Sequence, residues 1–173
     1  MSPTALTAAA YLASSMPICN PSDLKRLLAT GERLIGLDVG TKTIGMALSD
    51  TTLLVATPLD TIRRTRFRDD VRRLLAEIER HRVGGIVVGL PLGLDGSEGP
   101  RAQSVRQFAK DLLAHKDLPL AFWDERLSTA AVERQMIEAD LSRRRRAAII
   151  DRTAAAYIMQ GLLDRIGRPA PPS

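Results

Sequence analysis

The sequence RLIGLDVGTKTIGMALSD, at residues 33–50, predicts a β-hairpin with an acid beside its turn. Residues 33–39 are almost continuously apolar, and residues 44–49 alternate large and small side chains, as buried strands do. Residues 40–42 supply the glycine and the polar side chains of a turn between them. Asp38 comes just before this turn, so its carboxylate must emerge beside the core, where an unpaired charge is unfavourable.

Outward from the hairpin, the hydrophobic period predicts three more strands and several helices. Strands are expected at residues 53–62, 86–90 and 118–123, and helices at residues 67–81, from about residue 97, after Ser128 or Thr129, and from 143 to about 166. Gly84 and Gly85 are expected to end the helix at residues 67–81. Consecutive strands can pair as an antiparallel meander, whereas strands separated by helices lie parallel. We therefore expect an α/β fold with a mixed five-stranded sheet flanked by helices.

Length and composition favour one domain. The chain has 173 residues, of which 45% are hydrophobic, and this is enough for one sizeable core. We expect the domain to span residues 33–167. An N-terminal extension at residues 1–32, with a short helix capped by Ser22, would precede it, and a tail at residues 168–173 would follow.

The charge balance suits a polyanionic partner. Twenty-five Lys and Arg against 20 Asp and Glu leave a net charge of +5, although such a charge can also serve solubility alone.

The single cysteine, Cys19, excludes an internal disulfide, and two histidines are too few for a zinc site of Cys and His ligands. No apolar run approaches the roughly 20 residues that span a bilayer. A secretory signal begins with Lys or Arg, and neither precedes Lys25 in this sequence. We expect a cytoplasmic protein that does not associate with membranes.

Two of the acids follow apolar strands. Asp38 ends the first strand of the hairpin, and Glu125 comes just after the strand expected at residues 118–123. Open α/β sheets bind their ligands where strand ends converge. Both carboxylates are therefore candidates for a site at this edge of the sheet.

A third acid, Asp151, lies on the apolar stripe of a helix. Ala155, Ile158 and Leu162 follow it by 4, 7 and 11 residues, so all four share one helix face. A helix rarely directs a carboxylate toward the sheet beneath it unless a cation lies there. Carboxylate oxygens without histidine or cysteine favour Mg²⁺ or Mn²⁺. Each acid also has an ordinary interpretation, as a helix cap, a turn residue or the partner of an arginine.

Four ordered motifs carry a family resemblance. They are LDVGTKTIGMALSD at residues 37–50, VGLPL and DGSE within residues 88–98, DERLST at residues 124–129, and DRTAA at residues 151–155. Together they resemble the YqgF family of pre-16S ribosomal RNA nucleases, once described as Holliday-junction-resolvase-like. The resemblance implies a ribonuclease H-like fold and a role in maturing the 5′ end of 16S ribosomal RNA. It also implies that Asp38, Glu125 and Asp151 match the catalytic acids proposed for the family.

Phosphodiester hydrolysis by such acids has a known physical basis. Two divalent ions about 3.5–4 Å apart activate a water and neutralise the leaving oxygen. Asp38 is our candidate for the ligand that bridges two Mg²⁺ or Mn²⁺ ions, with Glu125 and Asp151 each completing the shell of one ion.

Several basic residues are candidates for nucleic-acid contacts. Lys42 and Arg126 could hold phosphate oxygens near the reacting centre, although Lys42 could equally be an ordinary turn lysine. A run of four arginines leads into the helix that bears Asp151, namely Arg143, Arg144, Arg145 and Arg146. This run could follow a nucleic-acid backbone or form a solvated face. Because aromatic content is only 3%, structured RNA recognised by shape is favoured over stacked single strands.

Three function hypotheses remain at this point. The first is a metal-dependent RNA endonuclease that processes pre-16S rRNA in ribosome biogenesis, and the second is a junction-cleaving DNA resolvase with the same acids. The third is a non-catalytic nucleic-acid-binding module, or a relict of the actin-like ATPase fold. Metal-dependent cleavage separates the first two from the third, and the choice of substrate separates the first from the second.

Overall fold

The computed structural model describes residues 18–127 and 142–167. Within its last helix, the side chains described are those of Arg144, Arg145 and residues 153–167. The strands are β1 (Arg33–Val39), β2 (Thr43–Ser49), β3 (Ala56–Arg63), β4 (Val83–Leu90) and β5 (Leu120–Asp124). The helices are η1 (Pro21–Asp23), α2 (Leu24–Leu27), α3 (Phe67–Arg80), α4 (Pro100–His115) and α6 (Arg143–Gly167).

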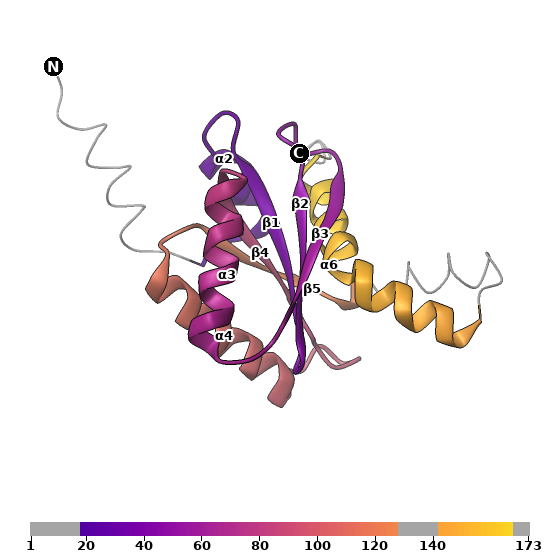
Figure 1. Cartoon of the computed structure of the whole chain (residues 1–173). Helices are drawn as coiled ribbons and strands as arrows, with labels where there is room; N and C mark the ends of the chain where they lie inside the picture. The colour runs from indigo at the N-terminus through magenta and orange to yellow at the C-terminus, as the bar shows by residue number, and fades with distance from the viewer. Residues whose placement is uncertain (1–17, 128–141, 168–173) are drawn as a thin grey trace, which may run out of the picture.

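The strands form a mixed sheet in the order β3-β2-β1-β4-β5. β1 pairs with β2 and β2 with β3 in antiparallel fashion, whereas β1 with β4 and β4 with β5 are parallel. This confirms the predicted meander followed by helical crossovers. Helices α3 and α4 cover one face of the sheet, and α6 covers the other (Figure 1).

Each face of the sheet buries its own hydrophobic cluster. Val71, Leu74 and Ile78 of α3 recur at helical spacing and pack with Phe108 and Leu112 of α4 against one face. A second cluster joins the opposite face to the stripe predicted on α6, whose Ala155, Ile158 and Leu162 are all buried. Since both faces are covered, β1 and β4 are apolar along most of their length.

Helix α3 ends for a different reason than predicted. We expected Gly84 and Gly85 to terminate it, but they lie inside β4, and the turn falls at His81 and Arg82 instead. A Cβ on Gly84 would lie 2.8 Å from Leu28 Cδ2. Because these two glycines have no side chains, neighbouring side chains have room to pack across β4. The glycines do not end the helix.

The remaining boundaries differ from prediction by a few residues. β3 begins at Ala56 because Leu53, at the expected start, has a φ of 60° and belongs to a turn. No side-chain cap at Ser22 starts the short N-terminal helix, since η1 follows Asn20 without a capping hydrogen bond. The predicted cap at Ser128 or Thr129 lies outside the described residues.

The short N-terminal helices pack against the sheet. Leu24 of α2 is fully buried in the cluster beneath α6, and the Cys19 N–H donates to the Leu120 carbonyl at 2.9 Å. The division of the chain at residues 33 and 167 stays a prediction. Among the described residues, no helix is both long enough and apolar enough to cross a membrane.

Candidate active site

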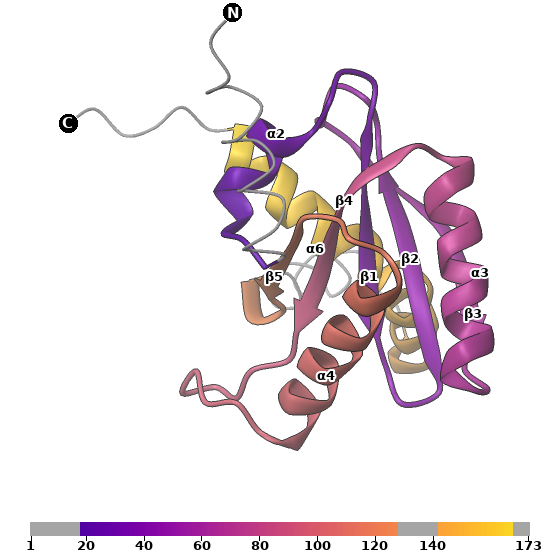
Figure 2. The same ribbon diagram turned by 90° about the vertical axis from the view of Figure 1, so that its left-hand side faces the viewer.

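Asp38 lies near the carboxyl end of β1, on the side that faces α6. It pairs with Gly45 of β2, and a Cβ on Gly45 would lie 3.7 Å from both Asp38 Cβ and Ala155 Cβ. The Asp38 side chain therefore stands next to α6, half-buried. The β1–β2 turn, the carboxyl end of β4 and the beginning of α4 lie together at this end of the sheet (Figure 2).

Glu125 approaches the same place from β5. Its backbone N–H donates to the Leu90 carbonyl at 3.2 Å, which holds the residue beside the end of β4. A Cβ on Gly89 would lie 2.9 Å from Glu125 Oε1 and 3.1 Å from Glu125 Cγ. The Glu125 side chain therefore crosses β4 over a glycine, toward Asp38 on the neighbouring strand.

The two carboxyl groups interact directly. The pKa of Glu125 is raised from 4.5 to about 7. Burial is the largest cause and the charge of Asp38 is the next, while the guanidinium of Arg101 acts against them. A hydrogen bond with Asp38 raises this pKa further. Two neighbouring carboxylates repel each other, so a proton or a cation between them lowers the energy of the pair. The pair is therefore able to share either a proton or a bound cation.

The opening over Gly89 yields a testable prediction. Gly89→Ala should displace Glu125, because the new methyl group would lie 2.9 Å from Glu125 Oε1 and 2.5 Å from Ile158 Cδ1. Both atoms end flexible side chains, so the fold should survive at a cost of about 1–3 kcal/mol. A misplaced catalytic group can cost about 100-fold in rate, and we expect a loss of this order in the activity proposed below.

Gly45→Ala is the matched control for this substitution. Its methyl group would make an ordinary 3.7 Å contact on the other side of Asp38. Melting temperatures and initial rates of both variants test the idea. Equal rates for the two would show that the placement of Glu125 over Gly89 is unimportant.

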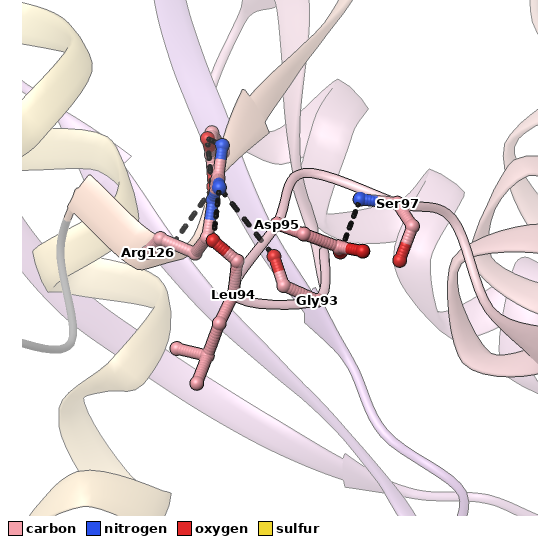
Figure 3. Close-up of polar contacts among 6 residues, drawn as sticks. Gly93, Leu94, Asp95, Ser97 and Arg126 are labelled. Atoms are coloured by element: carbon pink, nitrogen blue, oxygen red, sulfur yellow. Dashed lines mark hydrogen bonds and ion pairs between the residues drawn. The ribbon is translucent and has the colours of Figure 1, made fainter.

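Arg126 ties the end of β5 to the loop after β4. Its Nη2 lies 2.6 Å from Asp124 Oδ2, and its Nε donates to both carboxylate oxygens at 3.0 Å. Its Nη1 donates to the Gly93 carbonyl at 3.4 Å and to the Leu94 carbonyl at 3.2 Å (Figure 3). The hydrogen bonds from Arg126 hold the pKa of Asp124 below its usual range. The guanidinium that we expected to hold phosphate thus also fastens this loop.

The loop itself, at residues 93–97, is a tight turn. The Gly93 N–H donates to the Ser97 carbonyl at 2.9 Å. The Ser97 N–H donates to Asp95 Oδ1 at 2.9 Å (Figure 3). Gly96 has a φ of 84°, which favours glycine at this position. Leu94 at the tip is fully exposed.

The other predicted site residues are placed less completely. Lys42 is exposed in the β1–β2 turn, and Arg144 and Arg145 are exposed in the first turn of α6. The side chains of Arg143, Arg146 and Asp151 lie outside the described part of the chain. Among the described side chains, no group of three or more potential metal ligands gathers. The structure thus brings together Asp38 and Glu125, and it leaves the third acid untested.

Sequence reasoning missed the residues that bring the acids together. Gly45 and Gly89 flank Asp38 on the neighbouring strands, and Asp124 positions Arg126. Aligning the predicted strands in register would have indicated both glycines, because each adjoins the acid, and a side chain at Gly89 would fill the space that Glu125 crosses. No sequence pattern indicated Arg101, whose positive charge lowers the pKa of Glu125.

A mixed five-stranded sheet in this order, with helices on both faces and two acids at the ends of β1 and β5 on either side of β4, defines the ribonuclease H-like class of fold. The chain belongs to the RuvX family, whose model, described as "Holliday junction resolvase", matches residues 32–165. This confirms the resemblance noted for YqgF.

Two relatives with similar sequences agree with this assignment. A protein of Paramagnetospirillum magneticum is 58% identical over 86% of this chain and 96% of its own length. One of Rhodospirillum rubrum is 52% identical over 90% of this chain and 98% of its own length, and both are named "Putative pre-16S rRNA nuclease". A solved structure of T. thermophilus RuvC with a Holliday junction substrate aligns with a TM-score of 0.48 and 16% identity, over 79% of this chain and 96% of that one.

Proposed function

We propose that this protein is a metal-dependent endonuclease that hydrolyses RNA phosphodiester bonds, and that it processes the 5′ end of pre-16S rRNA in the cytoplasm. The observation that carries the proposal is the meeting of Asp38 and Glu125 at the carboxyl end of the sheet, although 86 residues separate them in the sequence. The choice of RNA as the substrate comes from the names of the two relatives described above.

The carboxylate pair fits a divalent cation. Glu125 has a pKa raised to about 7 because it is partly buried beside Asp38, so its ionised form needs a positive charge nearby. Oxygen ligands of this kind suit Mg²⁺ or Mn²⁺. We propose that Asp38 and Glu125 hold the metal, with two ions as the full complement.

Asp151 is proposed as the third ligand. Ala155 and Asp38 both lie 3.7 Å from the position of a Cβ on Gly45, and Asp151 comes one helical turn before Ala155 on α6. Residues four apart share a helix face. The backbone of α6 therefore supports a position for Asp151 close to the other two acids.

Each residue has a definable part in the reaction. When bound, the metal supplies a water of lowered pKa and neutralises charge on the phosphate. Asp38 and Glu125 would position the positive charge of the metal, and the backbone around Gly89 leaves the space above β4 open. Lys42 and Arg126 are proposed to contact phosphate oxygens, Arg126 while it keeps its ion pair with Asp124.

Purified full-length protein tests the proposal directly. Cleavage of matched structured RNA, duplex DNA and four-way DNA junctions is measured with Mg²⁺, with Mn²⁺ and with a chelator. We expect metal-dependent cleavage of the RNA. Preference for the junction would favour the resolvase named in the family description, and no cleavage of any substrate would favour a non-catalytic binding module.

The arginine run provides a separate prediction. Arg144 and Arg145 are exposed at the beginning of α6, so both can reach a nucleic-acid backbone. Replacing both with glutamine should lower the slope of log binding constant against log salt by up to about two. Fluorescence anisotropy with labelled RNA over a salt series measures this slope. If the slope does not change, the run is only a solvated surface.

A further inference from the structure

A small pocket opens on the α4 side of the same sheet end. Its volume is about 170 Å³, and it lies between the β1–β2 turn at Gly40 and Thr41 and the first turn of α4. Val39 and Val105 are among its apolar lining residues, and Arg64 and Arg101 line it together with the hydroxyl-bearing residues Thr41 and Ser104. No carboxylate lines this pocket among the described residues.

Arg64 is held in place by the structure around it. Its Nη1 donates to the Gly40 carbonyl at 2.6 Å, its backbone N–H donates to the Lys42 carbonyl at 2.8 Å, and its guanidinium carbon lies 5.6 Å from the centre of the Phe108 ring. A guanidinium has five N–H donors, so one hydrogen bond to Gly40 leaves others for a ligand. An arginine fixed in this way loses little side-chain entropy when it binds an anion.

Arg101 links the pocket to the carboxylates. Its guanidinium makes no hydrogen bond or salt bridge within the described part of the chain, yet its charge lowers the pKa of Glu125. It therefore lies between the pocket and the acids. The backbone N–H groups of the first turn of α4, a helix of 16 residues, add positive potential there.

We propose that this pocket binds a phosphate group of the RNA strand through Arg64 and Arg101, next to the phosphate that is cleaved at Asp38 and Glu125. The inference rests on the proposed nuclease function and adds a positioning site to it. An RNA strand that crosses the sheet end from α4 toward α6 would contact the pocket first and the acids next. Arg64 and Arg101 would then set which bond reaches the carboxylates.

Size and charge both favour phosphate over other ligands. Pockets for drug-sized molecules have volumes of about 300–1,000 Å³, and this pocket is smaller. Paired guanidinium groups match the oxygens of phosphate and would repel a metal cation. The group could be an internal phosphodiester or a 5′-terminal phosphate, which share this chemistry.

Binding by a full-length Asp38→Asn protein tests the site without cleavage. The probes are two labelled RNA hairpins of the same sequence, one with a 5′-phosphate and one with a 5′-hydroxyl, titrated with Mg²⁺ present over a salt series. Arg101→Gln and Arg64→Gln are introduced singly and together. Lys110→Gln is the charge-matched control, since Lys110 is exposed on the same helix, outside the pocket lining.

We expect Arg101→Gln to weaken binding about tenfold, because a hydrogen bond to a charged group contributes about 1.5 kcal/mol. The salt slope should fall by about one, whereas Lys110→Gln should change neither value. The double variant should lose less than the two single losses combined, because both arginines hold one group. Melting temperatures verify that Arg64→Gln keeps its fold after it loses the contact to Gly40.

The outcomes separate this inference from the proposed function. If Arg101→Gln binds both hairpins as Lys110→Gln does, the phosphate site is wrong even if the wild-type protein cleaves RNA. If Arg101→Gln weakens binding while no cleavage is found, the site stands and the nuclease function fails. A loss confined to the 5′-phosphorylated hairpin identifies a terminal phosphate as the ligand, and equal losses identify the backbone. A wild-type protein that binds neither hairpin overturns both ideas.

Discussion

Asp38→Asn is expected to lower RNA cleavage at least about 1,000-fold while RNA binding survives. The substitution keeps the shape of the side chain and removes the charge that the proposed metal ligand would supply. Metal stabilisation of the transition state contributes several kcal/mol, and each 1.36 kcal/mol is about tenfold in rate. Initial rates with Mg²⁺ and binding by anisotropy measure the two effects.

Stability distinguishes this variant from a structural mutant. Asp38 raises the pKa of Glu125, so the two carboxyl groups repel each other when ionised. Removing one charge should leave the metal-free fold unharmed or slightly more stable. If Asp38 were instead held by an arginine as a structural ion pair, Asp38→Asn would melt at a lower temperature and keep normal activity per folded molecule. That pattern would contradict the metal-ligand role.

Glu125→Gln is expected to abolish most cleavage and to change how stability depends on pH. The pKa of Glu125 is raised from 4.5 to about 7 in the folded protein, so ionising it costs folding free energy. The protonated group contributes stability that is fully present below about pH 4.5 and is lost as the pH rises through about 7. Glutamine stays neutral throughout. The variant should therefore be the more stable protein above pH 7 when no metal is present.

The size of this effect is limited by solvent. Glu125 is only half-buried, so we expect a gain of about 1 kcal/mol after allowance for screening. This corresponds to about 2–4 °C in melting temperature for a chain of this size. Melts of both proteins in chelator at about pH 5 and pH 8 measure the gain, which should be much smaller at the lower pH. Mg²⁺ should stabilise the wild type and not the variant, because binding to the native state favours folding.

Local patterns determined most of the architecture. The apolar runs within residues 33–50 and the stripe of Ala155, Ile158 and Leu162 indicate which side chains are buried, since each pattern belongs to one element. The order of strands and helices then limits how the sheet can be connected. For this reason the mixed sheet was predictable, whereas the ends of β3 and α3 were displaced by a turn at Leu53 and by packing over Gly84.

Only the tertiary structure decided how the site is assembled. The sequence by itself determined that Asp38 and Glu125 stand at strand ends, because apolar runs stop there. It did not determine that Glu125 reaches across Gly89 to Asp38, or that Arg64 and Arg101 line one pocket from separate elements. Those contacts depend on strand register and on the placement of α4. Both arise from packing between residues that are distant in the chain, and the hydrophobic periodicity of a single element does not indicate such packing.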